Sequence, residues 1–221
     1  MTERDVTERI AVALEVTRKK VFASALEWPG WSRSGKTPDA AIETMLAYAP
    51  RYAPVVRAAG LTLGTTFEVE VVEQLEGGTG TEFGVPSLPT AADIRPADAA
   101  EAARLATIVE ASWAEFDRVA AGAPAALRKG PRGGGRDRDK MIGHVNESDW
   151  YYGREIGLRD RKPAGGDRPA VEALRAAMLA ILRQPSDGRA LGDRKWPARY
   201  AARRIAWHAL DHAWEMEDRS T

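Results

Sequence analysis

The sequence predicts an α+β protein in which a small N-terminal module of strands and helix precedes an antiparallel four-helix bundle. Alternating apolar and polar residues, which are typical of half-buried strands, occur before residue 77, and long runs with helical periodicity follow residue 97. The interval 77–97 between them is rich in Gly, Pro and Thr, a composition that is typical of linkers. We therefore expect an α+β module at 1–76, a linker at 77–97 and a helical domain at 98–221.

Composition excludes several classes of function. The 221 residues contain no Cys, so disulfides, thiolate metal sites and a Cys nucleophile are all absent. Lys and Arg together number 32, as do Asp and Glu, and this balance gives no reason to expect nucleic acid or an anionic membrane as a partner. The charged start MTERDVTERI lacks the apolar run of a signal peptide, and no stretch approaches the length of a membrane span. We expect a cytoplasmic protein.

The N-terminal module should contain a hairpin, a helical stretch and a returning strand. The strands are expected at 9–16, 20–27 and 66–73, where apolar residues alternate with polar ones. Pro29-Gly30 marks a turn, Thr37 is suited to cap a helix, and Pro38 fits the first helical position. Pro50 and Pro54 interrupt the helical run, which Gly60 ends.

Two motifs of this module suggest a family. Glu27-Trp28-Pro29-Gly30 and Gly35-Lys36-Thr37-Pro38-Asp39-Ala40-Ala41 resemble the turn and the helix start of the HicB-like antitoxin module, with Asp-Ala where that family has Glu-Ala. The resemblance implies a role in binding a protein partner. The alternative is a small α+β domain with an ordinary turn.

Four helices are expected in the second part. They cover 98–120, 138–158, a third segment that starts within 165–169 and ends at Leu182, and 197–219. The segment 121–140 interrupts the helical pattern with glycines and mostly basic residues. In the last helix Trp207, Leu210 and Trp214 lie opposite the apolar face around Ile205, so this helix should be buried on two sides. Its second face should meet the N-terminal module or a second subunit, as in a homodimer.

The chain's three histidines form the candidate metal site. His208 and His212 are four residues apart, which places both imidazoles on one helical face, and His144 lies at the edge of the apolar stripe of the second helix. Three neutral imidazoles with a free fourth position suit a catalytic divalent metal, and without Cys ligands Zn²⁺, Ni²⁺ and Fe²⁺ are all acceptable. The alternative is that each histidine at a helix edge makes only an ordinary hydrogen bond.

Several other side chains are candidates for a part in this site. Glu215 and Asp211 flank the histidine pair, where a carboxylate could orient an imidazole or act as a base; a solvated edge is the alternative for Asp211. Tyr151 could donate a hydrogen bond to a substrate or could simply pack as an aromatic. Arg136 and Arg138 could pair with a substrate carboxylate or phosphate, or could belong to a solvated loop.

A second resemblance covers about residues 97–219. Met141-Ile142-Gly143-His144-Val145-Asn146-Glu147 with Tyr151-Tyr152, and His208-Ala209-Leu210-Asp211-His212, resemble the DinB/YfiT-like superfamily in order and spacing. That family is a four-helix bundle whose three histidines hold a divalent metal, and some members transfer low-molecular-weight thiols to electrophiles. The resemblance implies an enzyme of this class with a small-molecule substrate. The alternative is a binding protein in which the HicB-like module holds a partner and the bundle is a scaffold.

Overall fold

Four strands form one mixed sheet in the computed structural model, which describes residues 7–130 and 135–220. β1 (Thr7–Val16) and β2 (Val21–Ala25) form the expected antiparallel hairpin. β3 (Ser32–Gly35) extends the sheet beyond β2, and β4 (Thr66–Glu76) lies parallel to β1 on the other side, so the order is β3-β2-β1-β4. Sequence analysis missed β3, because Ser-Arg-Ser-Gly has no apolar alternation.

Two short helices connect β3 to β4. Thr37 caps α1 (Pro38–Ala47) by accepting a hydrogen bond from the backbone N–H of Ala40, as its position predicted. The chain turns at Tyr48 into α2 (Ala49–Ala58), whose first turn accommodates Pro50 because the N–H groups there have no intrahelical partner. The helices pack on the sheet through a shared apolar core that includes Met45, Tyr52 and Trp31.

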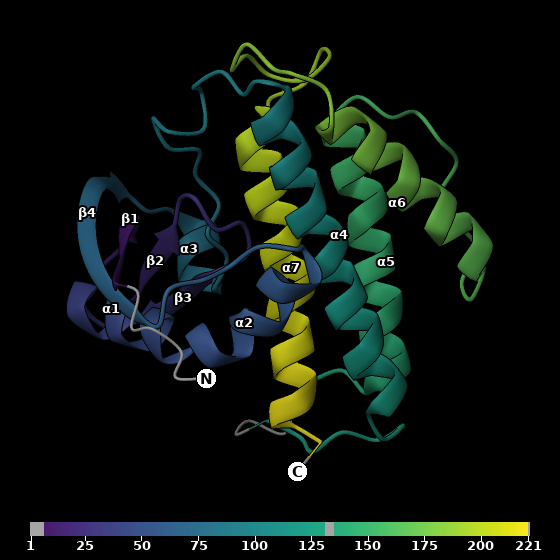
Figure 1. Ribbon diagram of the computed structural model, residues 1–221. Helices are drawn as coiled ribbons and strands as arrows, with labels where there is room; N and C mark the ends of the chain where they lie inside the picture. The colour runs from purple at the N-terminus through teal and green to yellow at the C-terminus, as the bar shows by residue number, and fades with distance from the viewer. Residues whose placement is uncertain (1–6, 131–134, 221) are drawn as a thin grey trace, which may run out of the picture.

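Four long helices form the rest of the fold (Figure 1). They are α4 (Ala99–Gly122), α5 (Arg138–Glu155), α6 (Arg168–Leu182) and α7 (Ala198–Asp218), close to the ranges expected from the sequence. Their inward stripes meet in one core, which includes Leu105, Phe116, Met141, Val145, Leu174, Met178 and Ile205. The structure is therefore α+β, with a small mixed sheet at the N-terminal side and helices after it.

A buried ion pair lies within this helical core. Arg175 of α6 donates from Nε to Asp149 of α5 at 3.0 Å, and Trp113 of α4 donates from Nε1 to the same carboxylate at 3.1 Å. Burial raises the pKa of Asp149, and the Arg175 guanidinium opposes that shift. The pair joins three helices through directional contacts, which apolar packing alone does not supply.

The second apolar face of α7 is covered by the N-terminal module. Leu210 and Trp214 are fully buried in the same core as Trp31 and Tyr52, and the Trp207 ring meets Phe22 edge to face at 6.2 Å. Gly30 of the Pro-Gly turn has φ +92°, and a Cβ there would lie only 2.8 Å from Leu210 Cδ1. The sequence left open whether the N-terminal module or a second subunit covers this face of α7, and in the structure the module covers it.

Hydrogen bonds hold the interval 77–97 against both the sheet and α7. It contains a short helix, α3 (Thr79–Phe83), whose Thr81 hydroxyl donates to the buried carboxylate of Glu15 in β1 at 2.9 Å. The same carboxylate accepts the backbone N–H groups of Ser87 and Leu88 at 3.0 and 2.9 Å. Further along, Arg203 of α7 donates from Nε to the buried Asp93 at 2.9 Å. These contacts tie the segment to the sheet and to α7.

No helix in the described parts of the chain is long and apolar enough to cross a membrane.

Candidate metal centre

The helices α5 and α7 bring the three histidines together. His208 and His212 lie one turn apart on α7, and their ring centroids are 4.7 Å apart. The ring of His144 from α5 completes a triangle, at 5.1 Å from His208 and 4.9 Å from His212. One ligand atom from each residue lies within 4.8 Å of the others. The three histidines therefore form a cluster that could hold a metal ion, as the sequence predicted.

One nitrogen pair in the cluster has the spacing of two ligands on a single divalent metal. The Nε2 atoms of His144 and His208 face each other at 3.2 Å. Two imidazole nitrogens bound to one tetrahedral zinc at about 2.0–2.1 Å would lie about 3.3 Å apart, close to this separation. All three donors are imidazoles, a set that suits zinc, nickel and iron.

Glu215 fixes the orientation of the third imidazole. Its Oε2 lies 3.0 Å from Nδ1 of His212, and Oε1 accepts from Arg219 at 2.7 Å. The hydrogen bond from His212 lowers the pKa of Glu215, so the carboxylate is ionised and can only accept. In the neutral form of His212, Nδ1 carries the proton that it donates to Glu215, and Nε2 is the nitrogen that can bind a metal. The sequence predicted Glu215 at the flank of the histidine pair, and the structure joins it to His212, three residues before it.

Burial keeps the other two imidazoles neutral. It lowers the pKa of His144 to about 4, with a further contribution from His212 and from the positive charge of Arg136. The pKa of His208 is also lowered well below its usual value, again mainly by burial. Neutral imidazoles are the form that binds metals, so the site is ready for a cation near neutral pH.

The aromatic residue against the cluster is Tyr152. Its ring meets His208 edge to face at 5.4 Å, and the Arg204 guanidinium lies over the Tyr152 ring at 5.1 Å. Tyr151 is 53% exposed, and its ring contacts Trp150 at 4.8 Å. Of the two tyrosines, the sequence pointed to Tyr151 as a candidate, and it did not distinguish Tyr152 or Arg204. Arg204 lies four residues before His208 on the same helix, and this spacing could have indicated from the sequence that the two side chains share a helical face.

An open cavity of about 470 Å³ adjoins His144. Its wall includes Arg136, Lys140 and Lys162. Arg138, the other arginine considered from the sequence, instead donates to Asp139 and to the carbonyl of Ala123. The volume lies in the range of small-ligand sites, so a small molecule could reach the histidines from this side.

Asp211 has a structural partner. It accepts from Arg33 of β3 at 2.8 Å, so it joins α7 to the sheet. This contact matches neither of the two roles considered from the sequence, because the carboxylate lies between the two parts of the fold.

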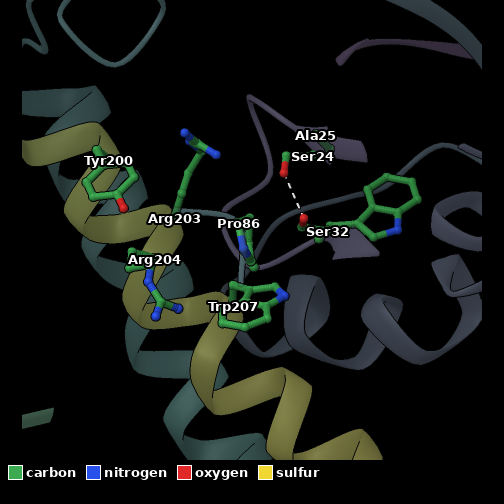
Figure 2. Close-up of a pocket in the computed structure, with 10 residues that line it drawn as sticks. Ser24, Ala25, Ser32, Pro86, Tyr200, Arg203, Arg204 and Trp207 are labelled. Atoms are coloured by element: carbon green, nitrogen blue, oxygen red, sulfur yellow. Dashed lines mark hydrogen bonds between the residues drawn. The ribbon is translucent and has the colours of Figure 1, made fainter. Parts of the chain in front are cut away.

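A second cavity lies on the opposite side of α7 and is much smaller. Figure 2 shows Tyr200, Arg203, Arg204 and Trp207 extending from α7 toward Pro86 and the β2–β3 strands, where the hydroxyls of Ser24 and Ser32 are hydrogen-bonded at 2.7 Å. Its volume is about 10 Å³, which is room for about one water molecule. This cavity is too small for a substrate, whereas the cavity at His144 has room for one and adjoins a histidine of the cluster.

Comparisons of the whole chain with protein-family models, with curated proteins and with solved structures return no match, so the site's chemistry is inferred from its own residues.

Proposed function

We propose that the protein is a divalent-metal-dependent enzyme that joins a low-molecular-weight thiol to a small electrophile, on a bundle of the DinB-like kind. The observation that carries this proposal is the cluster of His144, His208 and His212 beside a cavity of about 470 Å³. Three imidazoles leave a coordination position for a ligand from outside the protein, which is the arrangement of catalytic sites. The metal would be zinc, nickel or iron.

Each residue of the site has a distinct role in this proposal. The three histidines hold the cation, and Glu215 holds His212 in the tautomer that can bind it. A divalent cation held there would lower the pKa of a thiol bound to it, so that sulfur becomes a nucleophile near neutral pH. Because the chain has no Cys, the thiol must be a small molecule. Tyr151 is 53% exposed and adjoins Tyr152, which contacts His208, and we propose it as a contact for the substrate.

The reaction itself is a substitution at the electrophile. The thiol gives its S–H proton to solvent water, its sulfur forms a bond to the electrophilic carbon, and the leaving group departs with the electron pair of the bond that breaks. The cavity next to His144 gives both reactants a place on one side of the cluster, where proximity replaces a bimolecular encounter in water.

A non-catalytic role in binding a protein partner is the second candidate. The observation that favours it is the free edge of β4, where Val71 and Val72 are 45% and 49% exposed. An unpaired strand edge can accept a strand from another protein. In this case the HicB-like module would hold the partner, and the histidine cluster would have no substrate.

Metal analysis of the purified protein separates the two candidates. We expect about one divalent metal per chain after dialysis against a mild chelator, and none in His208→Ala, because the two remaining imidazoles bind weakly. Asp211→Asn is the matched control, since Asp211 lies between the two ligands on α7 but contacts Arg33. A thiol-consumption assay with an alkyl halide then tests for the reaction. Full metal occupancy in His208→Ala would refute the site.

A further inference from the structure

We propose that the thiol used by this site is anionic, and that Arg136 and Lys140 bind its negatively charged group in the cavity beside His144. This inference rests on the proposed function, because it names the substrate class of the same site. Three observations support it: positively charged side chains line the cavity, they lie near the histidines, and the chain as a whole has no net charge.

Uncompensated positive charge lines the cavity. Of its three cationic residues, Lys162 forms an ion pair with Glu147, which also lines the cavity. Among the residues that the structure describes, neither Arg136 nor Lys140 forms an ion pair with a carboxylate. Two positive charges therefore remain for a ligand, and the cavity has an excess of positive charge in a chain whose overall charge is zero.

These charges stand at a suitable distance from the metal ligands. Lys140 and His144 are four residues apart on α5, and they therefore lie on the same face of that helix, one turn from each other. Arg136 lies just before the helix and lines the same cavity as His144. A molecule of a few carbon atoms can thus place sulfur at the histidines and an anionic group at the two cations.

The opposite wall of the cavity favours a small polar ligand. It is formed by the segment 162–166, in which Gly165 and Gly166 carry no side chain and a Cβ at either would meet nothing within 4 Å. Asn146 adds an amide to the lining. The cavity is open to solvent, and a carboxylate bound there would form charge-assisted hydrogen bonds with Arg136.

Binding of matched thiols to the cobalt-loaded protein tests the inference. The probes are 3-mercaptopropionate and its neutral counterpart 3-mercapto-1-propanol, and the readout is the cobalt–sulfur absorption band during titration at low salt. We expect the anionic thiol to bind at least about tenfold more tightly, the effect of one charge-assisted hydrogen bond. In the double variant Arg136→Gln/Lys140→Gln the ratio of the two dissociation constants should fall to about one.

Two further variants make the result specific. Lys36→Gln removes an exposed lysine from the N-terminal module and should leave the ratio as it is. Arg136→Glu/Lys140→Glu should reverse the preference, so that the cationic thiol cysteamine binds more tightly than 3-mercaptopropionate. Both cavity residues lie on the surface, so these changes leave the core intact.

The outcomes distinguish this inference from the function on which it rests. If both probes bind the unaltered protein with equal affinity, the site uses thiols but the anionic preference is wrong. If the preference persists in the double variant, Arg136 and Lys140 are not its source and the inference fails. If neither thiol perturbs the cobalt spectrum, the proposed function fails, and the inference fails with it.

Discussion

At the scale of single residues, the site depends on how each imidazole is held. His212 is fixed through Nδ1 by Glu215, and that carboxylate is fixed in turn by Arg219. His144 and His208 are held by burial and by each other, with their Nε2 atoms 3.2 Å apart. A cation bound between the rings would replace the hydrogen bond between these two nitrogen atoms with two metal–nitrogen bonds.

Glu215→Gln should weaken metal binding without disturbing the fold. A glutamine keeps the size of the side chain but removes the charge that makes the His212 imidazole a better ligand, and loss of such a partner typically costs about 10–100-fold in affinity. The dissociation constant can be measured by competition with a chromophoric chelator. Glu217→Gln is the control. Glu217 lies on the same helix as Glu215, but it pairs with Arg51 of α2 and Arg118 of α4 and not with a histidine. Equal affinities for the two variants would show that Glu215 does not support the ligand.

The stability of the metal-free protein should fall as the pH falls from about 6.5 to about 4. In this range the unfolded chain protonates His144 at its usual pKa, whereas the folded chain keeps it neutral because its pKa is about 4. The unfolded state therefore binds more protons, and acid favours unfolding. Urea denaturation at several pH values measures the slope, which should be shallower in His144→Asn. An identical slope in the two proteins would contradict the lowered pKa.

At the scale of helices and strands, local signals predicted most of the elements. Thr37 and Pro38 mark the start of α1, and the apolar stripes around Val145 and Ile205 gave α5 and α7 close to their observed bounds. β3 was missed because its pairing with β2, and not its composition, makes it a strand. The composition of 77–97 could not reveal that a carboxylate on β1, Glu15, binds this segment.

The site was predictable only in part for a related reason. The spacing of His208 and His212 places them together on any helix, and His144 could be added because it occupies a matching edge. The contact between Tyr152 and His208, and the bond between Glu215 and His212, depend on how α5 and α7 are rotated about their axes. That rotation is set by the packing of many core residues at once, which a single helical wheel does not contain.

Breaking the ion pair between α5 and α6 should be costly. Arg175→Ala leaves Asp149 buried with only the Trp113 N–H as a partner, and an uncompensated buried charge destabilises by about 3–5 kcal/mol. Denaturant unfolding gives the change in free energy. The double variant Arg175→Met/Asp149→Leu should recover most of the loss, because it removes both charges. If Arg175→Ala costs no more than the double variant, the pair does not contribute in this way.

At the scale of the whole molecule, the fold has two apolar cores that share α4 and α7. One lies among the four long helices, and the other lies between the sheet, α1, α2, one face of α4 and the face of α7 that carries Leu210 and Trp214. The histidines lie at the edge of the first core and belong to neither. A chain with this much buried apolar surface does not need a metal to fold.

Metal removal should therefore leave the fold intact. The stripped protein should keep its helical circular dichroism. Its free energy of unfolding should fall only by the linkage effect of the lost ligand, about 2.7 kcal/mol relative to protein at a metal concentration of 100 times the dissociation constant, and its melting temperature should fall accordingly. Adding zinc back should restore the melting temperature in proportion to the logarithm of its concentration. Complete unfolding on removal of the metal would mean that the cation is structural.

The dependence of both cores on α7 has a consequence for biosynthesis. This helix follows every other described element along the chain, so a ribosome makes the sheet, α1 and α2 long before it makes Leu210 and Trp214. Until α7 emerges, the nascent N-terminal module presents its apolar surface to solvent, and such surfaces are the ones that chaperones recognise. Folding of the module should thus be completed only after α7 has left the ribosome, and a chain interrupted before residue 198 should aggregate although its sheet is fully encoded.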